Sequence, residues 1–208
     1  MPVYKTISPN SQTTVKIWKI TESYDFLIQD LELKPETLKR VLGMKSELHQ
    51  RGFLSVRHLL KAFGYTDADL FYDQHGKPHL KDGKQISITH SFIFSAVVIS
   101  DGIVGIDIEK QREKIKVIAH KFVDYEINYL NEAANDYVQY LTKIWCVKES
   151  LYKLFATPGL SFKQHCLVIP FSSDTDDTIA WIDYKNKKHR YNVACLEFEG
   201  FTFAYAIQ

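Results

Sequence analysis

The sequence predicts an α+β fold, because each half of the chain combines strand-like runs with one substantial helix. Apolar residues recur at spacings of three and four over residues 35–64 and again over residues 136–155, which is the period of a helix with one buried face. β-branched, alternating runs occupy residues 85–109 and much of the chain after residue 166, as is typical of strands.

The first half begins with a strand at residues 15–20, and Thr21 caps a short helix that extends to residue 31. Pro35 opens the longer helical region. The positions expected to interrupt or end this region are glycines: Gly43 or Gly52 as the break, and Gly64 at the end.

The middle of the chain is predicted to form two strands, a turn and a third strand. Asp101-Gly102, flanked by apolar residues, is typical of a type I′ hairpin turn. Such a turn would pair Ala96 with Asp107 and place His90 close to that carboxylate on the neighbouring strand.

The second half continues with helical segments at residues 114–122 and 124–131, followed by the long helix, which Pro158-Gly159 ends. Strands separated by polar loops complete the chain, at residues 166–171, 178–183, 191–197 and 201–207.

A first acidic motif, Gly-Ile-Asp-Ile-Glu, ends at Glu109. Side chains alternate along a strand, so Asp107 and Glu109 project from one face while Ile106 and Ile108 face the core. Alone, such a pair of carboxylates is common on the polar face of a half-exposed sheet.

A second motif runs from Trp145 to Lys153 and contains Glu149 and Lys153, which lie four residues apart on one face of a helix. Alone, this spacing usually gives a solvated surface pair. Together, the two motifs can gather three carboxylates and a cation, and an all-oxygen set with open positions suits Mg²⁺ and substrate phosphates. A phosphate-handling magnesium site is the favoured interpretation.

The ordered motifs resemble those of the phosphopantetheinyl transferases of the surfactin-synthetase-activating (Sfp) type. Besides the two acidic motifs, the matching segments are Gly76-Lys77-Pro78, Ser87-Ile88-Thr89-His90-Ser91, and a helix with Ala119, Phe122 and Glu126. Ser87 departs from the asparagine frequent in that family. The resemblance implies two similar α+β subdomains, residues 1–101 and 102–208, related by a pseudo-twofold with the active site in the cleft between them.

The resemblance also implies the reaction. An apo acyl or peptidyl carrier protein would supply a serine that takes 4′-phosphopantetheine from coenzyme A, releasing 3′,5′-ADP. Asp107, Glu109 and Glu149 would hold Mg²⁺, which assists the chemistry at the pyrophosphate. Glu149 could instead or also accept the serine proton, and Lys153 would approach the leaving phosphate.

The nucleotide phosphates of coenzyme A are expected to contact Arg57, Lys77, Thr89 and His90, with Lys148 as a weaker candidate. In the family an arginine on the first long helix contacts the 3′-phosphate, and Arg57 matches it by position. The plainer alternatives are that the basic residues of this helix form a solvated face and that a lone strand histidine is structural.

Composition narrows the possible partners and compartment. The formal charge of +1 argues against bulk nucleic-acid binding, and no signal peptide or membrane span is expected. Three widely separated cysteines without C-x-x-C spacing favour a reduced compartment, so we expect a cytoplasmic protein. We also expect a monomer.

Two other function classes remain open. A magnesium-dependent small-nucleotide phosphohydrolase could use the same carboxylates to activate water. A non-catalytic coenzyme A-binding module could retain the fold, although the presence of both Glu149 and Lys153 disfavours it.

Overall fold

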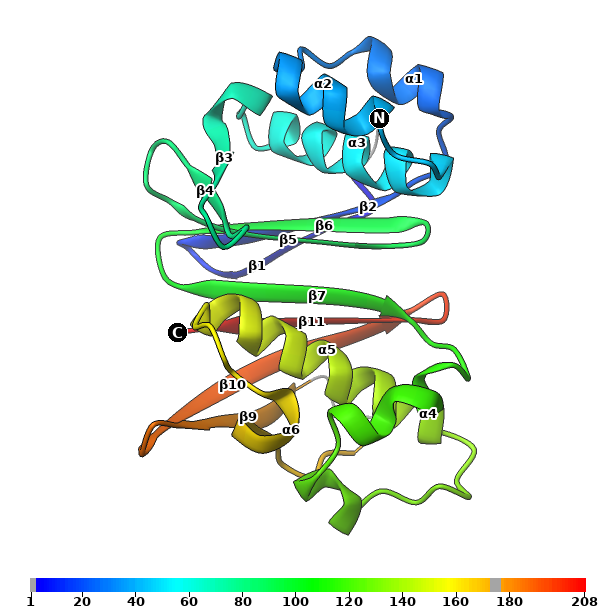
Figure 1. The fold of residues 1–208 in the computed structure, drawn as a ribbon, viewed down its shortest axis with the longest axis vertical. Helices are drawn as coiled ribbons and strands as arrows, with labels where there is room; N and C mark the ends of the chain where they lie inside the picture. The colour runs from blue at the N-terminus through cyan, green and yellow to red at the C-terminus, as the bar shows by residue number, and fades with distance from the viewer. Residues whose placement is uncertain (1–2, 173–176) are drawn as a thin grey trace. The chain divides into compact units, whose positions relative to one another are not determined.

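The computed structural model describes residues 3–172 and 177–208. The chain divides into an N-terminal unit, Met1–Gly102, and a C-terminal unit, Ile103–Gln208. Each unit contains both helices and strands, which confirms the α+β class (Figure 1). The pseudo-twofold relation stays a prediction.

The N-terminal unit contains a four-stranded antiparallel sheet in the order β1-β2-β6-β5. Its strands are β1 (Lys5–Asn10), β2 (Thr13–Lys19), β5 (Gln85–Ser91) and β6 (Phe94–Ser100). A separate hairpin pairs β3 (Leu70–Tyr72) with β4 (Pro78–Leu80) after a short 3-10 turn, η1 (Asp67–Asp69). The sequence did not predict β1 or this hairpin.

Three helices cover one face of this sheet: α1 (Tyr24–Gln29), α2 (Pro35–Leu42) and α3 (Glu47–Ala62) (Figure 1). Ser23 caps α1 by accepting the Phe26 N–H, so the prediction of Thr21 as the cap is wrong. The predicted long helical region is broken after Gly43, whereas Gly52 lies inside α3.

The predicted hairpin across Asp101-Gly102 is also wrong. Strand β6 pairs with β2 and β5, so Ala96 lies opposite Thr89. Strand β7 (Val104–Lys110) belongs to the other sheet, where Asp107 lies opposite Ala204. The turn residues therefore mark the passage from one unit to the next.

The C-terminal unit contains a five-stranded antiparallel sheet in the order β7-β11-β10-β9-β8. Its other strands are β8 (Cys166–Val168), β9 (Asp177–Tyr184), β10 (Lys187–Phe198) and β11 (Phe201–Ile207). The long helix α5 (Tyr137–Phe155) packs across β7 and β11, and the core lies between helix and sheet (Figure 1). The short helical segments are α4 (Ile115–Ile118), η2 (Ala119–Lys121), η3 (Tyr125–Asn128) and α6 (Phe162–His165).

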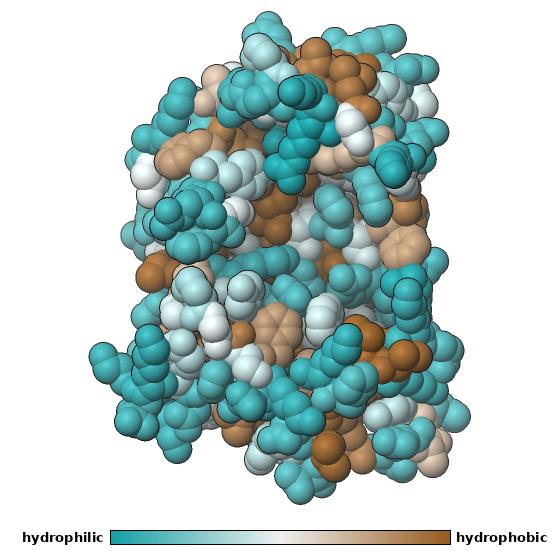
Figure 2. Space-filling view, in the orientation of Figure 1, coloured by the Kyte–Doolittle hydropathy of each residue, from teal (hydrophilic) through white to brown (hydrophobic). Residues whose placement is uncertain are grey.

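The surface visible in Figure 2 is mainly hydrophilic, with apolar patches scattered among polar side chains. Within the described residues, no helix has both the length and the apolar character needed to cross a bilayer.

Candidate active site

The two carboxylates of the first acidic motif lie on the face of the sheet that α5 covers. Every second residue of β7 faces the helix, namely Gly105, Asp107 and Glu109. The side chain of Asp107 contacts Lys153 of α5. Both faces of β7 are covered, since Ile106 and Ile108 are 0% exposed and Asp107 is only 4% exposed. The expectation that the carboxylates lie on the side away from the core is therefore corrected.

Gly105 allows this close approach of strand and helix. A Cβ atom built at this position would lie 2.0 Å from the carbonyl oxygen of Ser150 and 2.8 Å from the amide nitrogen of Leu154. Any side chain would therefore separate β7 from α5. The glycine lets the middle of α5 rest directly on the strand, next to Asp107.

Lys153 joins the helix to the strand through its ammonium group. Its Nζ atom donates to Asp107 Oδ1 at 2.8 Å and to the carbonyl oxygen of Ile106 at 2.9 Å. Charge-assisted bonds of this kind hold a lysine in a defined direction. The structure thus brings together two of the three residues for which the sequence predicts a catalytic role.

Glu149, one helical turn before Lys153, shares this environment. Burial is the largest cause that raises the pKa of Glu149 to about 7; the charge of Asp107 raises it further, and Lys153 opposes the shift. A carboxyl group with a pKa near neutrality can exchange a proton at physiological pH. This is the behaviour required of a general base.

The donor types at this position suit Mg²⁺. Asp107, Glu109 and Glu149 offer only oxygen ligands, and Mg²⁺ commonly takes one or two carboxylates together with waters and substrate phosphates. Within residues 3–172 and 177–208, no group of three or more His, Cys, Asp or Glu side chains is arranged to hold a metal ion. The metal ligands therefore stay a prediction.

Lys148 has a different environment from Glu149. Its side chain is 0% exposed, and its Nζ atom contacts Glu126 Oε1 at 2.8 Å and the carbonyl oxygens of Phe122 and Phe162 at 2.7 and 3.2 Å. These contacts use all three ammonium donors. We infer that Lys148 has a structural role and ties α5 to the segments on either side of it.

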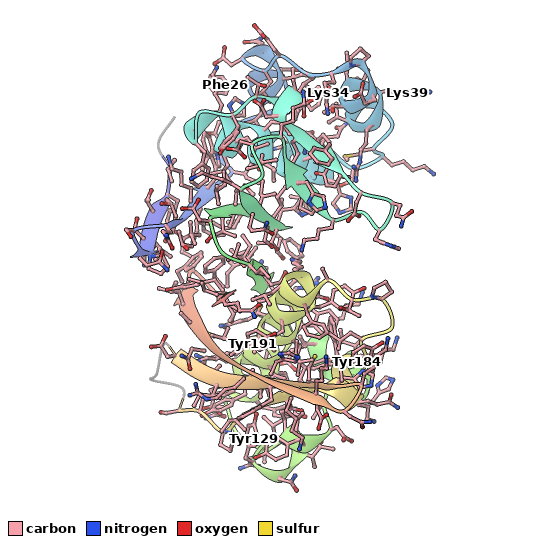
Figure 3. All side chains as sticks on the ribbon, turned by 90° about the vertical axis from the view of Figure 1, so that its left-hand side faces the viewer. Phe26, Lys34, Lys39, Tyr129, Tyr184 and Tyr191 are labelled. Atoms are coloured by element: carbon pink, nitrogen blue, oxygen red, sulfur yellow. The ribbon has the colours of Figure 1, made fainter. Side chains whose placement is uncertain are left out.

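The N-terminal unit contains a cavity of about 320 Å³ beside α2, α3 and β3. Cations and aromatic rings form much of its wall: Lys34, Arg40 and Arg57 with Phe53, Phe71 and Tyr72. Lys34 is labelled beside the helices in Figure 3, where Lys39 projects from α2 at the surface. Positive charge next to flat apolar surface suits a ligand that carries both a phosphate and a ring.

Arg57, the sequence-predicted phosphate ligand, lines this cavity but already has an anionic partner. Its Nε atom lies 3.2 Å from Asp67 Oδ1, and both side chains are almost fully buried. The guanidinium also lies 3.6 Å from the centre of the Phe53 ring. Its charge is therefore balanced by Asp67 before any ligand binds.

Arg40 is the more available cation in the cavity wall. It is exposed, and its guanidinium lies 5.3 and 5.7 Å from the ring centres of Phe53 and Tyr72. Across the described chain, it forms no ion pair. Sequence analysis missed Arg40, although its place in the last turn of a helix opened by Pro35 could have suggested it.

Lys77 lies on the β3–β4 hairpin, whose turn is organised by Asp73. The Asp73 carboxylate accepts hydrogen bonds from His79 Nε2 at 3.1 Å and from the backbone N–H groups of Lys77 and His75 at 3.0 and 2.8 Å. The His79 bond is the largest cause that lowers the pKa of Asp73 to about 2. Asp73 thereby fixes the backbone that carries Lys77.

Thr89 and His90 are neighbours on β5 with opposite exposure. Thr89 is 7% exposed, whereas His90 is an exposed residue that lies opposite Ser95 in the β5–β6 register. A phosphate could therefore reach His90 more readily than Thr89.

Comparison with protein families gives a match over residues 103–206 to the 4′-phosphopantetheinyl transferase superfamily. The chain belongs to this superfamily. The match contains both acidic motifs, including Asp107, Glu109, Glu149 and Lys153. The comparison with curated proteins gave no match.

Membership in the 4′-phosphopantetheinyl transferase superfamily supports a transferase activity. Coenzyme A and a carrier protein are the partners that the superfamily implies. The matched region is almost the whole C-terminal unit, so the helix–strand contact around Gly105 lies within the part of the chain that carries the family signal.

In this transferase, Gly105→Ala is expected to lower the free energy of unfolding by at least about 2–3 kcal/mol, because the methyl group would overlap the backbone of α5. Denaturant unfolding measures the change. Gly43→Ala is the matched control, since Gly43 ends α2 at a φ of −76° and its Cβ would meet no atom closer than 3.4 Å. Equal stability of the two variants would contradict the close-approach role of Gly105.

Proposed function

We propose that the protein transfers 4′-phosphopantetheine from coenzyme A to a serine of an apo acyl or peptidyl carrier protein and releases 3′,5′-ADP. In this proposal it is a transferase of the surfactin-synthetase-activating type. The supporting observation is the junction of β7 and α5, where Lys153 binds Asp107 and the pKa of Glu149 is raised to about 7.

The chemistry assigned to the residues follows from their charges. The serine oxygen forms a bond to the β-phosphorus of coenzyme A, and the phosphoanhydride bond to the nucleotide breaks. Glu149 accepts the serine proton, directly or through a water. Lys153 stabilises the negative charge that develops on the departing 3′,5′-ADP. Mg²⁺, held by Asp107, Glu109 and Glu149, would neutralise the pyrophosphate oxygens.

The nucleotide end of coenzyme A is assigned to the N-terminal unit. We propose contacts from Lys77, Thr89 and His90 to its phosphates, as the family resemblance implies. For the 3′-phosphate we propose Arg40 as the direct ligand, because Arg57 already binds Asp67. Arg57 would then support the cavity wall.

These two arginines are expected to differ when each is replaced by alanine. Arg40→Ala should weaken the binding of coenzyme A by about tenfold or more but change the binding of 3′-dephospho-coenzyme A little, because a charge-assisted contact exists only with the 3′-phosphate. Arg57→Ala should mainly reduce stability, by about 3 kcal/mol, since it leaves Asp67 buried without its cation.

Calorimetric titration with coenzyme A and with 3′-dephospho-coenzyme A measures the two affinities of each variant. Thermal unfolding of both variants measures the loss of stability. If Arg40→Ala weakens both donors equally, Arg40 does not contact the 3′-phosphate. If Arg57→Ala shows the selective loss instead, the original assignment from the family resemblance holds.

A transfer assay tests the proposed function. The protein is incubated with coenzyme A, Mg²⁺ and a panel of apo carrier proteins, and intact mass reports the modified carrier. A magnesium-dependent nucleotide hydrolase would leave every carrier unmodified while consuming the donor. A coenzyme A-binding module would bind the donor without consuming it.

The proposed location is the cytoplasm. The three cysteines, Cys146, Cys166 and Cys195, are buried and form no disulfide within the described residues, which is compatible with a reducing compartment.

A further inference from the structure

Gly52 lies in the interior of α3, where glycine is unfavourable. Alanine is the better helix former there, because glycine loses more conformational freedom on folding. Gly52 does not have the positive φ that would require glycine. Some other feature must therefore account for a glycine at this position.

The side chain of His90 lies directly against Gly52. A Cβ atom built on Gly52 would lie 3.3 Å from Cδ2 of the imidazole, 3.4 Å from Cγ and 3.8 Å from the Cβ of His90. The shortest of these distances, to Cδ2, is tighter than an ordinary carbon contact, so a methyl group would displace the ring by a few tenths of an ångström. The surface of α3 at Gly52 thus sets the position of the imidazole.

The same turn of α3 is bonded to the strand beside His90. Ser55 Oγ donates to the carbonyl oxygen of Gly52 at 2.8 Å and shares a second hydrogen bond with Ser95 Oγ at 2.8 Å, and these serines are fully buried. Ser95 of β6 lies opposite His90 of β5 in the sheet register. These hydrogen bonds therefore connect α3 to β6 at the point where the imidazole of His90 contacts Gly52.

We propose that Gly52 is a positioning residue for His90: it lets the imidazole lie directly against α3, at the place from which His90 contacts a phosphate of coenzyme A. This inference rests on the proposed function, which assigns that phosphate contact to His90. Gly52 itself touches no substrate, and its effect on binding passes through the histidine.

The test compares Gly52→Ala, His90→Ala and the double variant with the parent protein. In the parent background, Gly52→Ala should weaken the binding of coenzyme A by about three- to tenfold, because the displaced ring makes a poorer charge-assisted contact. It should also shift the NMR signals of the His90 ring. In the His90→Ala background the same substitution should leave the affinity unchanged and raise the melting temperature by ~2–4 °C, since only the helix preference for alanine remains.

Calorimetric titration gives the affinities, and Gly43→Ala is the control for a glycine substitution in the same unit without a contact to His90. Equal weakening of coenzyme A binding by Gly52→Ala in both backgrounds would overturn the inference, because the effect would then not pass through His90. An unshifted His90 ring signal in Gly52→Ala would also overturn it.

Failure of the proposed function is distinguishable from failure of this inference. If His90→Ala binds coenzyme A as tightly as the parent, the phosphate role of His90 fails, and the positioning role of Gly52 fails with it. The transfer assay on carrier proteins would still report the transferase activity independently. If transfer is absent while the coupling between Gly52 and His90 persists, the site binds coenzyme A without the proposed reaction.

Discussion

Replacing Glu149 with glutamine is expected to lower the single-turnover rate of phosphopantetheine transfer by about 10²–10⁴-fold, because the amide cannot accept the serine proton. The binding of coenzyme A should change little, since glutamine keeps the shape and one acceptor oxygen. Calorimetry measures binding, and rapid-mixing transfer measures the rate. A parent rate in Glu149→Gln would show that this carboxylate is neither the base nor a required metal ligand.

The pH dependence of transfer provides a second readout of Glu149. Because burial raises the pKa of this carboxyl group to about 7, the ionised form that accepts a proton is lost as the pH falls below that value. The parent rate should therefore decrease about tenfold per pH unit below pH 7 at limiting Mg²⁺. If Glu149 also binds the metal, saturating Mg²⁺ favours the ionised form and moves the decrease to lower pH.

Breaking the pair of Asp107 and Lys153 is the second large effect expected. Lys153→Met should lower the rate at saturating coenzyme A by about 10²–10³-fold, because the cation acts on charge that develops in the transition state. Asp107→Asn should lower it to a similar extent through the loss of the proposed metal ligand and of the partner that orients Lys153. Asparagine is a better replacement than alanine at position 107, because the Asp107 side chain is buried.

The double variant Asp107→Asn/Lys153→Met separates stability from chemistry. Each single variant leaves one charge of the pair without its partner, whereas the double variant removes both. The melting temperature should therefore recover in the double variant while transfer stays lost. Recovery of transfer together with stability would mean that the pair has only a structural role.

The sequence predicted the composition of the β7–α5 junction because local spacing determines it. Residues two apart on a strand share a face, and residues four apart on a helix share a face, so Asp107 with Glu109 and Glu149 with Lys153 follow from the chain alone. The local spacing did not predict which face of β7 the carboxylates occupy. Both faces of β7 are covered, and the absence of a side chain at Gly105 lets α5 pack against the acidic face.

Non-local pairing was the part of the fold that local pattern could not predict. Asp101-Gly102 has the composition of a hairpin turn, but β7 pairs with β11, almost a hundred residues later in the chain. A turn signal reports backbone preference and carries no information about the partner strand. The predicted closeness of His90 to the carboxylates depended on this hairpin, so the observed strand pairing no longer supports it.

The residues proposed to bind the nucleotide illustrate a similar limit. Arg57 and Arg40 are both basic residues on helices, and only the fold shows that Asp67 lies beside Arg57 while Arg40 contacts two aromatic rings. Lys148 likewise matched the pattern of a phosphate contact, yet its partner Glu126 comes from a distant segment and is fully buried with it. Burial of the cation itself together with a carboxylate from another segment distinguishes Lys148 and Arg57 from the exposed Arg40.

Simultaneous measurement of coenzyme A consumption and carrier modification distinguishes phosphopantetheine transfer from hydrolysis. The protein is mixed with coenzyme A and Mg²⁺ in the presence of an apo carrier, of the same carrier with its acceptor serine replaced by alanine, or of no carrier. If the protein is a phosphopantetheinyl transferase, 3′,5′-ADP appears only with the intact carrier and in equal amount to the modified serine. Release of 3′,5′-ADP without a carrier, or with the alanine carrier, would contradict a transferase and indicate hydrolysis instead.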